Sequence, residues 1–426
     1  MTNDKTATRL SSWTIEDALA PTVKRPRVVS TATSEAESSS DTGRLIKLAV
    51  GIWLASRVVL FLATYLVQVI ISWRHHTGLV LPWDMITRWR EFDAIDYINI
   101  AQYGYTSLYR SAFFPLYPAL IALVDFLFLG RQPVLAAMVV NNVGALIGSI
   151  GLAFVAVRET RRYDVARWTL LAFFAYPLAF FLAAPYSEGL FLASFAWCLW
   201  ATRQRIWWLA ALLALTASLT RVTGVILIIP MLLEYLQAME WGKRLSLRDV
   251  QTRVLSGVLL VITAPLGISL FMLYLGKSIG DPFGFYHAQV FFGHSTLFYP
   301  VGLVEGIHFY LSRPFLSFTQ MRQMIDFLPL LGLTAVAVIA ARKQPLAYTV
   351  LVVELFVLTT QSPKIYSPGN AVFVSAGRYM MMALPSFLMI GGWFARNPKL
   401  GLLCCGASFL VEIVFAVYFL QGGAII

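Results

Sequence analysis

The chain has 426 residues, of which 58% are hydrophobic, 14% aromatic and only 13% charged. A soluble domain carries about 25% charged residues, so the composition excludes a soluble protein and indicates an all-α, polytopic membrane protein. The formal net charge of +11 is then better explained by membrane topology than by nucleic-acid binding. The cysteines, Cys198, Cys404 and Cys405, have the spacing of neither a disulfide framework nor a metal site.

Residues 1–44 differ in composition from the rest of the chain. They are rich in Ser, Thr and Ala, contain one aromatic residue, Trp13, and balance six Lys/Arg against six Asp/Glu. We expect a disordered cytoplasmic tail. It has no apolar core of the signal-peptide type, so the first hydrophobic run is predicted to be an uncleaved anchor. Residues 45–426 are predicted to form one transmembrane domain.

A membrane-spanning helix needs roughly 17–25 mostly apolar residues. The runs that approach this length predict about eleven spans, within a range of 10–13: 45–73, 133–157, 168–186, 187–202, 206–221, 223–239, 254–276, 325–341, 345–361, 378–395 and 400–421. The run 113–129 is interrupted by Pro115, Pro118 and Asp125. We interpret it as re-entrant or interfacial.

Lysine and arginine cluster in the short connections between the predicted spans, at 158–167, 203–205, 243–253, 342–343 and 396–399. If 113–129 does not cross the membrane, all of these clusters fall on the same side as the tail, as expected for cytoplasmic loops. The topology then has a cytoplasmic amino-terminus. Three longer segments are external, at about 74–131, 277–324 and 362–377.

The first external segment is too aromatic and apolar to be a solvated loop, so we expect interfacial helices there. Asp93 and Asp96 are three residues apart, which places both carboxylates on one face of a helix. Two such acids suit a general base or metal ligands. Alternatively, both cap or solvate an interfacial helix.

Glu188 lies in Ala-Pro-Tyr-Ser-Glu, a polar break between two apolar runs. An ionisable residue at a membrane boundary is a functional candidate. Equally, it can be an N-terminal acid that complements the dipole of the following helix.

Three arginines lie within or beside predicted spans: Arg57, Arg221 and Arg378. A charge in the bilayer is costly, so each should face protein, water or an anion. The planar guanidinium matches phosphate oxygens, and Arg221 and Arg378 are placed near the external side. They are candidates for binding a lipid phosphate, and snorkelling to headgroups is the alternative, above all for Arg57.

Asp281 and His287 lie just outside the seventh predicted span and are available for proton transfer or ion binding, although their spacing matches no metal-ligand code. Walker, dinucleotide-binding, HExxH and GxSxG motifs are absent from the sequence. Chemistry on a lipid-borne substrate is therefore favoured over soluble nucleotide chemistry.

Five ordered motifs, FDAIDYINIAQYGY with AFFPLYP, YPLAFFLAAPYSEGLFLA, LTRVTG, GDPFGFYHAQ and SAGRYMMMALPSF, resemble the PIG-V family of membrane mannosyltransferases, within the GT-C glycosyltransferases. The resemblance covers about residues 50–395. The family includes the enzyme that adds the second mannose in glycosylphosphatidylinositol assembly. The resemblance implies a polyprenyl-phosphate (dolichyl-phosphate) sugar donor, most often mannose, an external active site and a glycan or glycolipid acceptor.

The family's Phe-Asp-Ala element matches Phe92-Asp93-Ala94, which makes Asp93 the expected catalytic base, with Asp96 as a second catalytic candidate that positions the acceptor. Glu188, Arg221, Asp281, His287, Arg378 and Tyr379 are the expected substrate-binding residues. No cofactor or metal ion is expected. We find no endoplasmic-reticulum retrieval signal, which favours a plasma membrane, with the endoplasmic reticulum as the eukaryotic alternative. The competing function is a transporter or flippase for an anionic lipid or sugar, but such proteins commonly show internal repeats, and none is visible here.

Overall fold

The computed structural model describes residues 31–76, 78–239, 246–292, 301–312, 314, 318–360, 373 and 375–424. These described residues form helices joined by turns, with no strand among them. The chain divides into two compact units, Met1–Arg44 and Leu45–Ile426, and the helix bundle belongs to the second. Of the first unit, residues 31–44 form the beginning of a helix, and residues 1–30 of the predicted tail lie outside the described part.

Four of the described helices are long and apolar enough to cross a membrane: α1 (Thr31–His75), α5 (Pro133–Thr160), α10 (Leu247–Ser278) and α17 (Pro398–Leu420). They coincide with four of the predicted spans. Most of the apolar stretch of α5 is buried inside the protein, whereas only a third or less of the corresponding stretch is buried in α1, α10 and α17. Apolar side chains exposed along a whole helix are suited to lipid, so these features confirm the prediction of an all-helical, polytopic membrane protein.

The other predicted spans coincide with shorter helices: α6 (Tyr163–Phe174), α7 (Glu188–Arg203), α8 (Trp207–Thr220), α9 (Ile228–Ala238), α13 (Phe318–Ile339), α14 (Leu346–Thr360) and α16 (Leu384–Arg396). The run 168–186 is not one helix, because α6 ends at Phe174 and a separate 3-10 turn, η3 (Ala179–Leu182), follows. α4 (Leu116–Leu127) has 12 residues and is therefore about 18 Å long, shorter than the hydrocarbon core of a bilayer.

Short elements connect these helices: α2 (Pro82–Arg88), α3 (Asp93–Tyr103), η2 (Tyr109–Ala112), η4 (Val222–Leu227), α11 (Gly284–His287), η5 (Ala288–Phe292), α12 (Val301–Leu311), α15 (Ala376–Tyr379) and η6 (Met380–Met382). α2 and α3 lie in the segment predicted to be interfacial. They expose Trp83 and Tyr103, which are residue types that favour the headgroup level of a membrane.

α5 and α7 pack closely through glycines, as small residues permit in membrane helices. A Cβ added to Gly144 of α5 would lie 2.5 Å from the amide nitrogen of Leu190, and one added to Gly189 of α7 would overlap the carbonyl oxygen of Asn141. The Asn141 side chain accepts a hydrogen bond from the Gly189 amide at 2.6 Å and donates to the carbonyls of Phe181 and Ala184 at 2.8 and 2.6 Å. Asn141 therefore fixes the turn before α7 and the first residue of that helix, Glu188.

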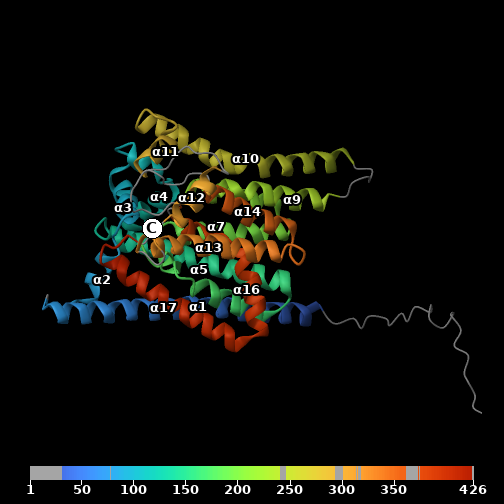
Figure 1. The fold of residues 1–426 in the computed structure, drawn as a ribbon. Coiled ribbons are helices and arrows are strands. Elements are labelled where there is room, and N and C mark those ends of the chain that lie inside the picture. Colours follow the sequence, from blue (N-terminus) through green and yellow to red (C-terminus); the bar gives the residue numbers. More distant parts are fainter. Residues whose placement is uncertain are drawn as a thin grey trace, which may run out of the picture. The chain divides into compact units, whose positions relative to one another are not determined.

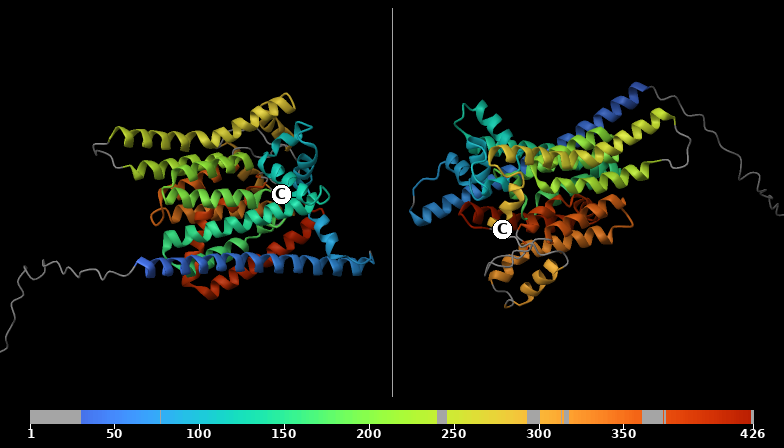
Figure 2. Two further views of the ribbon diagram at one scale, coloured as in Figure 1. Left: turned by 180° about the vertical axis from the view of Figure 1, so that it is seen from behind. Right: turned by 90° about the horizontal axis from the view of Figure 1, so that it is seen from above.

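The two ends of α7 lie in different surroundings, about 24 Å apart for a 16-residue helix. At its carboxyl end Arg203 forms ion pairs with Glu159 at 2.7 Å and with Glu234 at 2.6 Å, and Arg158 donates to the Arg203 carbonyl at 2.8 Å. At the amino end of α7, Figures 1 and 2 show α3, α4 and α11 gathered at one end of the bundle. The basic residues Arg158 and Arg203 and the helix α3 of the predicted external segment thus lie at opposite ends of α7.

Candidate functional site

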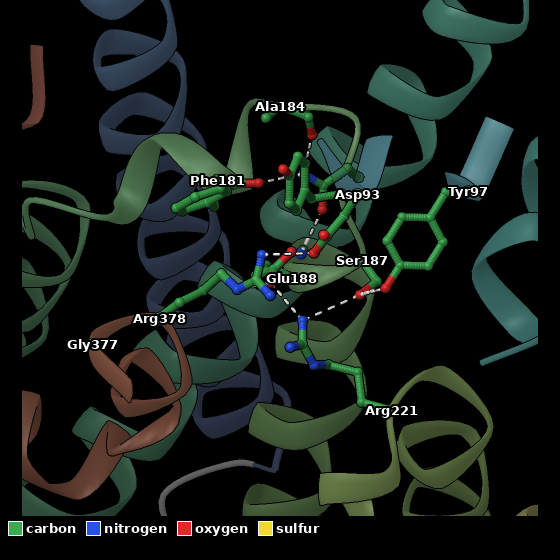
Figure 3. Close-up of polar contacts among 12 residues, drawn as sticks. Asp93, Tyr97, Phe181, Ala184, Ser187, Glu188, Arg221, Gly377 and Arg378 are labelled. Carbon is green, nitrogen blue, oxygen red and sulfur yellow. Dashed lines mark hydrogen bonds and ion pairs between the residues drawn. The ribbon is translucent and has the colours of Figure 1, made fainter. Parts of the chain in front are cut away.

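Arg378 and Asp93 form an ion pair at this end of the bundle. Arg378, in α15, donates a hydrogen bond from Nη1 to Oδ2 of Asp93, the first residue of α3, at 3.0 Å. The Arg378 side chain is 7% exposed and that of Asp93 is 27% exposed. The Asp93 side chain is therefore partly exposed, whereas the guanidinium of Arg378 is buried; Figure 3 shows the pair.

The backbone is strained close to both partners of this pair. Phe92 has φ of 50° and Ser375 has φ of 66°, in the left-handed region that side chains other than glycine rarely adopt. Such a conformation costs on the order of 1–3 kcal/mol and persists only where the surrounding structure holds it, as at ligand-binding and catalytic sites. Phe92 directly precedes Asp93, and Ser375 lies three residues before Arg378.

Glu188 bridges two arginines with a single oxygen. Its Oε1 lies 2.5 Å from Nη1 of Arg221 and 3.2 Å from Nε of Arg378. The Glu188 side chain is only 2% exposed and that of Arg221 is 11% exposed. Glu188 is the first residue of α7, where the helix dipole favours an acid, and it is also paired with two cations; its role in substrate binding stays a prediction.

Hydrogen bonds return from Arg221 to α3. Nη1 of Arg221 donates to the Ser187 hydroxyl at 3.3 Å, and that hydroxyl lies 2.9 Å from the hydroxyl of Tyr97. Tyr97 is one turn after Asp93 on α3. These side-chain contacts run from Asp93 through Arg378, Glu188, Arg221 and Ser187 to Tyr97, and α3 itself closes the ring between Tyr97 and Asp93 (Figure 3). The ring fixes α3 against α7. We call Asp93, Glu188, Arg221 and Arg378 the ionic cluster.

The backbone at Gly377 positions Arg378. Its amide donates to Oδ1 of Asp326 at 2.8 Å, and its carbonyl accepts a hydrogen bond from the Tyr176 hydroxyl at 2.7 Å. A Cβ at Gly377 would lie 2.7 Å from the Ile325 carbonyl oxygen, so only glycine fits. Neither Asp326 nor Tyr176 is among the site residues predicted from the sequence. An acid inside an apolar run was the available signal for Asp326, whereas Tyr176 had none.

Aromatic rings surround the two guanidinium groups. The central guanidinium carbon of Arg378 lies 5.2 Å from the ring centre of Phe181 and 5.5 Å from that of Tyr186, and the corresponding carbon of Arg221 lies 5.0 Å from the ring centre of Tyr379. Such cation–π contacts stabilise partly desolvated cations. Tyr379 therefore contacts a charged group of the cluster, in agreement with its place among the candidate site residues, but its role in substrate binding stays a prediction.

Asp96 lies beside the cluster with different partners. It is 3.9 Å from Arg110 and lies beside Tyr109. Burial, reinforced by the charge of Asp93, raises the pKa of the Asp96 carboxyl above its ordinary value. Burial and the adjoining Asp96 in turn raise the pKa of Tyr109 to about 12. Asp93 and Asp96 thus share α3 but not their surroundings.

The remaining candidates lie apart from the ionic cluster. Asp281 and His287 pair with each other at 2.7 Å, on an exposed turn, and no described contact joins them to the cluster. Arg57 is buried in α1, near Glu412 of α17. Among the described residues, no group of three or more His, Cys, Asp or Glu is arranged to hold a metal ion.

A groove of about 510 Å³, lined mostly by apolar side chains, lies between η4, α9 and α14. Residues of η4 and α9 line one side of it and residues of α14 the other, including Val225, Ile229, Val353 and Val357. Since η4 starts at Val222, directly after Arg221, the element that lines one side of the groove follows a residue of the cluster in the chain.

Comparisons with known proteins give a structural similarity but no similarity in sequence. No protein-family model matches the chain, and no curated protein matches it. Among solved structures, the chain is similar to "ArnT from Cupriavidus metallidurans bound to Undecaprenyl phosphate", with 16% sequence identity and a TM-score of 0.44 over 81% of this chain. The match spans 59% of that structure's chain. Fold and site together define a polytopic, all-helical membrane protein with a buried ionic cluster at one end of its helices.

Proposed function

We propose that this protein is a membrane glycosyltransferase that transfers a sugar, mannose, from a polyprenyl-phosphate donor to a lipid-linked or other glycan acceptor on the external face. One observation carries the proposal: Asp93, a partly exposed carboxylate, shares Arg378 with Glu188, and Glu188 also pairs with the second buried arginine, Arg221. A candidate base and a candidate phosphate site are thus adjacent.

The two arginines suit the leaving group of this reaction. Departure of a lipid phosphate from the anomeric carbon leaves the electron pair, and negative charge, on a phosphate oxygen. Preorganised cations stabilise such developing charge in a water-poor site, and guanidinium groups match phosphate oxygens in geometry. Arg221 and Arg378 are mostly buried and held by Glu188, so little reorganisation is needed when phosphate binds.

Asp93 suits the role of general base. The acceptor oxygen attacks the anomeric carbon, a new carbon–oxygen bond forms, the bond to the phosphate oxygen breaks, and the hydroxyl proton passes to the Asp93 carboxylate. Among the cluster's acids Asp93 is the exposed one and Glu188 is enclosed. An acceptor can therefore reach Asp93 but not Glu188.

Two further observations support the proposal. The groove lined by η4, α9 and α14, of which η4 follows Arg221 in the chain, can hold the polyprenyl chain of a donor whose phosphate contacts the arginines. Four of the five motifs that resemble the PIG-V family each contribute one residue to the ionic cluster: Asp93, Glu188, Arg221 and Arg378. We therefore also propose that α3 lies on the external side, with the basic connections and the amino-terminus in the cytoplasm.

The experiment is a transfer assay with purified protein in lipid vesicles. Radiolabelled polyprenyl-phosphate mannose is the donor, a glycolipid extract from cells lacking the protein supplies the acceptors, and products are identified by mass spectrometry. Mannose transfer by the parent, lost in Asp93→Asn, supports the proposal. Absence of transfer from every polyprenyl-phosphate sugar, together with protein-dependent movement of such lipids between leaflets, would replace it with the flippase alternative.

A further inference from the structure

The arrangement of charge in the ionic cluster points to a selective role for Glu188. We propose that Glu188 sets the net charge of the phosphate site, so that the site selects a lipid phosphodiester with one negative charge over lipids whose head groups carry two or more. This inference rests on the proposed function and assigns a specificity-determining residue within it.

Glu188 and Asp93 differ in how readily they can be displaced from Arg378. Glu188 is almost fully enclosed and Asp93 is partly exposed. An incoming phosphate can exchange with the Asp93 carboxylate at Nη1 of Arg378, because Asp93 is the partly exposed partner of that contact. It cannot exchange with Glu188, whose Oε1 also contacts Arg221. Glu188 is therefore a permanent member of the site, and Asp93 an exchangeable one.

The formal charges then determine which anion fits. The two arginines and two carboxylates sum to zero without ligand. When phosphate replaces Asp93 on Arg378, the phosphate faces two guanidinium groups and one carboxylate, a net charge of +1. A sugar–phosphate–polyprenyl diester carries one negative charge and balances it. A phosphate monoester carries about −1.5 to −2 at pH 7, and a pyrophosphate at least as much, so both leave negative charge unbalanced.

Burial makes this imbalance matter. Two like charges separated by about 4 Å interact several times more strongly near a partly buried site than in water. A buried group without a counter-charge retains most of its desolvation cost. Glu188 Oε2 is itself buried without a hydrogen-bond donor in the described structure, so Glu188 can contribute repulsion toward a second phosphate charge. The same repulsion favours release of the monoester product.

The test compares binding of three lipids with one short polyprenyl chain: the mannosyl phosphodiester, the monophosphate and the pyrophosphate. Their dissociation constants are measured by competition with radiolabelled diester on the purified full-length protein. The readout is the ratio of the pyrophosphate constant to the diester constant within each variant, because a general loosening of the site affects both lipids and cancels.

Glu188→Gln should lower this ratio at least about tenfold, since it removes one negative charge from the site. Arg221→Gln should raise it, and the double variant, which restores the net charge, should return it toward the parent value. Glu188→Asp keeps the charge and should leave the ratio within about threefold of the parent. Glu234→Gln, at the opposite end of α7, is the matched control. If Glu188→Gln does not fold, the Arg221→Gln and double variants still decide the question.

The inference is overturned if the ratio in Glu188→Gln equals that of the parent, or if the ratio in the double variant equals that of Arg221→Gln. Sugar transfer by the parent protein would then still leave the proposed function intact. If the parent transfers no sugar and binds none of the three lipids, the proposed function fails and this inference fails with it. The two failures are distinguished by the parent protein alone.

Discussion

Arg378 donates a hydrogen bond to Asp93 at 3.0 Å, although the two residues are 285 positions apart in the chain. This pair joins the carboxylate proposed as the base to a guanidinium proposed to bind phosphate. A donor phosphate that takes the place of Asp93 on Arg378 frees a carboxylate beside the anomeric carbon. Donor binding and base activation are thereby coupled through one side chain.

The first prediction concerns the arginines. Arg378→Ala and Arg221→Ala should each raise the KM for the polyprenyl-phosphate donor at least about tenfold, because each removes a charge-assisted contact to phosphate. Lysine at either position should restore activity only in part, since the fork geometry is lost. Initial rates at limiting and saturating donor measure the effect.

Arg203→Ala is the matched control. It removes a half-buried arginine that is paired with two carboxylates and that lies at the other end of α7. It should lower the thermal stability of the protein and leave the KM for the donor unchanged. Donor KM values equal to the parent in both Arg378→Ala and Arg221→Ala would rule out phosphate binding by these side chains.

A second prediction tests the topology. After replacement of Cys404 and Cys405 by serine, a cysteine at exposed Tyr103 should react with a membrane-impermeant maleimide in intact cells. A cysteine at exposed Arg162 should react only after permeabilisation. The remaining native cysteine, Cys198, is buried and gives little background. The opposite labelling pattern would place the ionic cluster on the cytoplasmic side.

The sequence predicted the long helices because a lipid-facing helix carries its signal in its own residues, as in α1, α10 and α17. It also singled out Asp93, Glu188, Arg221 and Arg378 one by one, since charge near an apolar run is conspicuous. Their convergence was not predictable from spacing, because no helical or strand period relates positions so far apart. The contacts depend on close approaches such as that of Gly189 to α5.

For other candidate site residues, the neighbouring sequence did not predict the contact partners. Asp281 and His287 were predicted to bind substrate, but they pair with each other across six positions of the chain. Residue types alone do not show whether two such side chains pair with each other or are open to a substrate. Asp326 and Tyr176 act on the backbone of Gly377. A side chain that acts only by hydrogen-bonding to the backbone of another residue has no recognisable motif around it in the sequence.

A third prediction uses the raised pKa of Asp96. In the native state Asp96 keeps its proton to a higher pH than in the unfolded chain, so the native state binds more protons in that window and the free energy of unfolding falls as pH rises through it. Asp96→Asn should therefore unfold at a higher temperature than the parent at neutral pH. The difference should disappear at pH values below the ordinary pKa of an aspartate, about 3.9.

Thermal unfolding in detergent, followed by circular dichroism across this pH range, measures the difference. Asp164→Asn is the control of opposite sign, because a hydrogen bond from Arg162 lowers the pKa of Asp164. That substitution should not raise the unfolding temperature at neutral pH. A lower unfolding temperature for Asp96→Asn at neutral pH would show that its charged form stabilises the fold.

The last prediction assigns the base. Asp93→Asn keeps the size of the side chain and its ability to accept a hydrogen bond from Arg378, but it cannot take a proton from an acceptor hydroxyl. Because general-base catalysis typically contributes 10²–10⁴-fold, kcat should fall at least about a hundredfold. Binding of the donor should be retained, since Arg221 and Arg378 stay in place. Asp96→Asn should lose less activity, because Asp96 contacts Arg110 and Tyr109 rather than the arginines of the cluster. Single-turnover transfer with donor bound in advance separates the chemical step from binding. Near-normal turnover in Asp93→Asn, with activity abolished in Asp96→Asn, would reassign the base to the second carboxylate of α3.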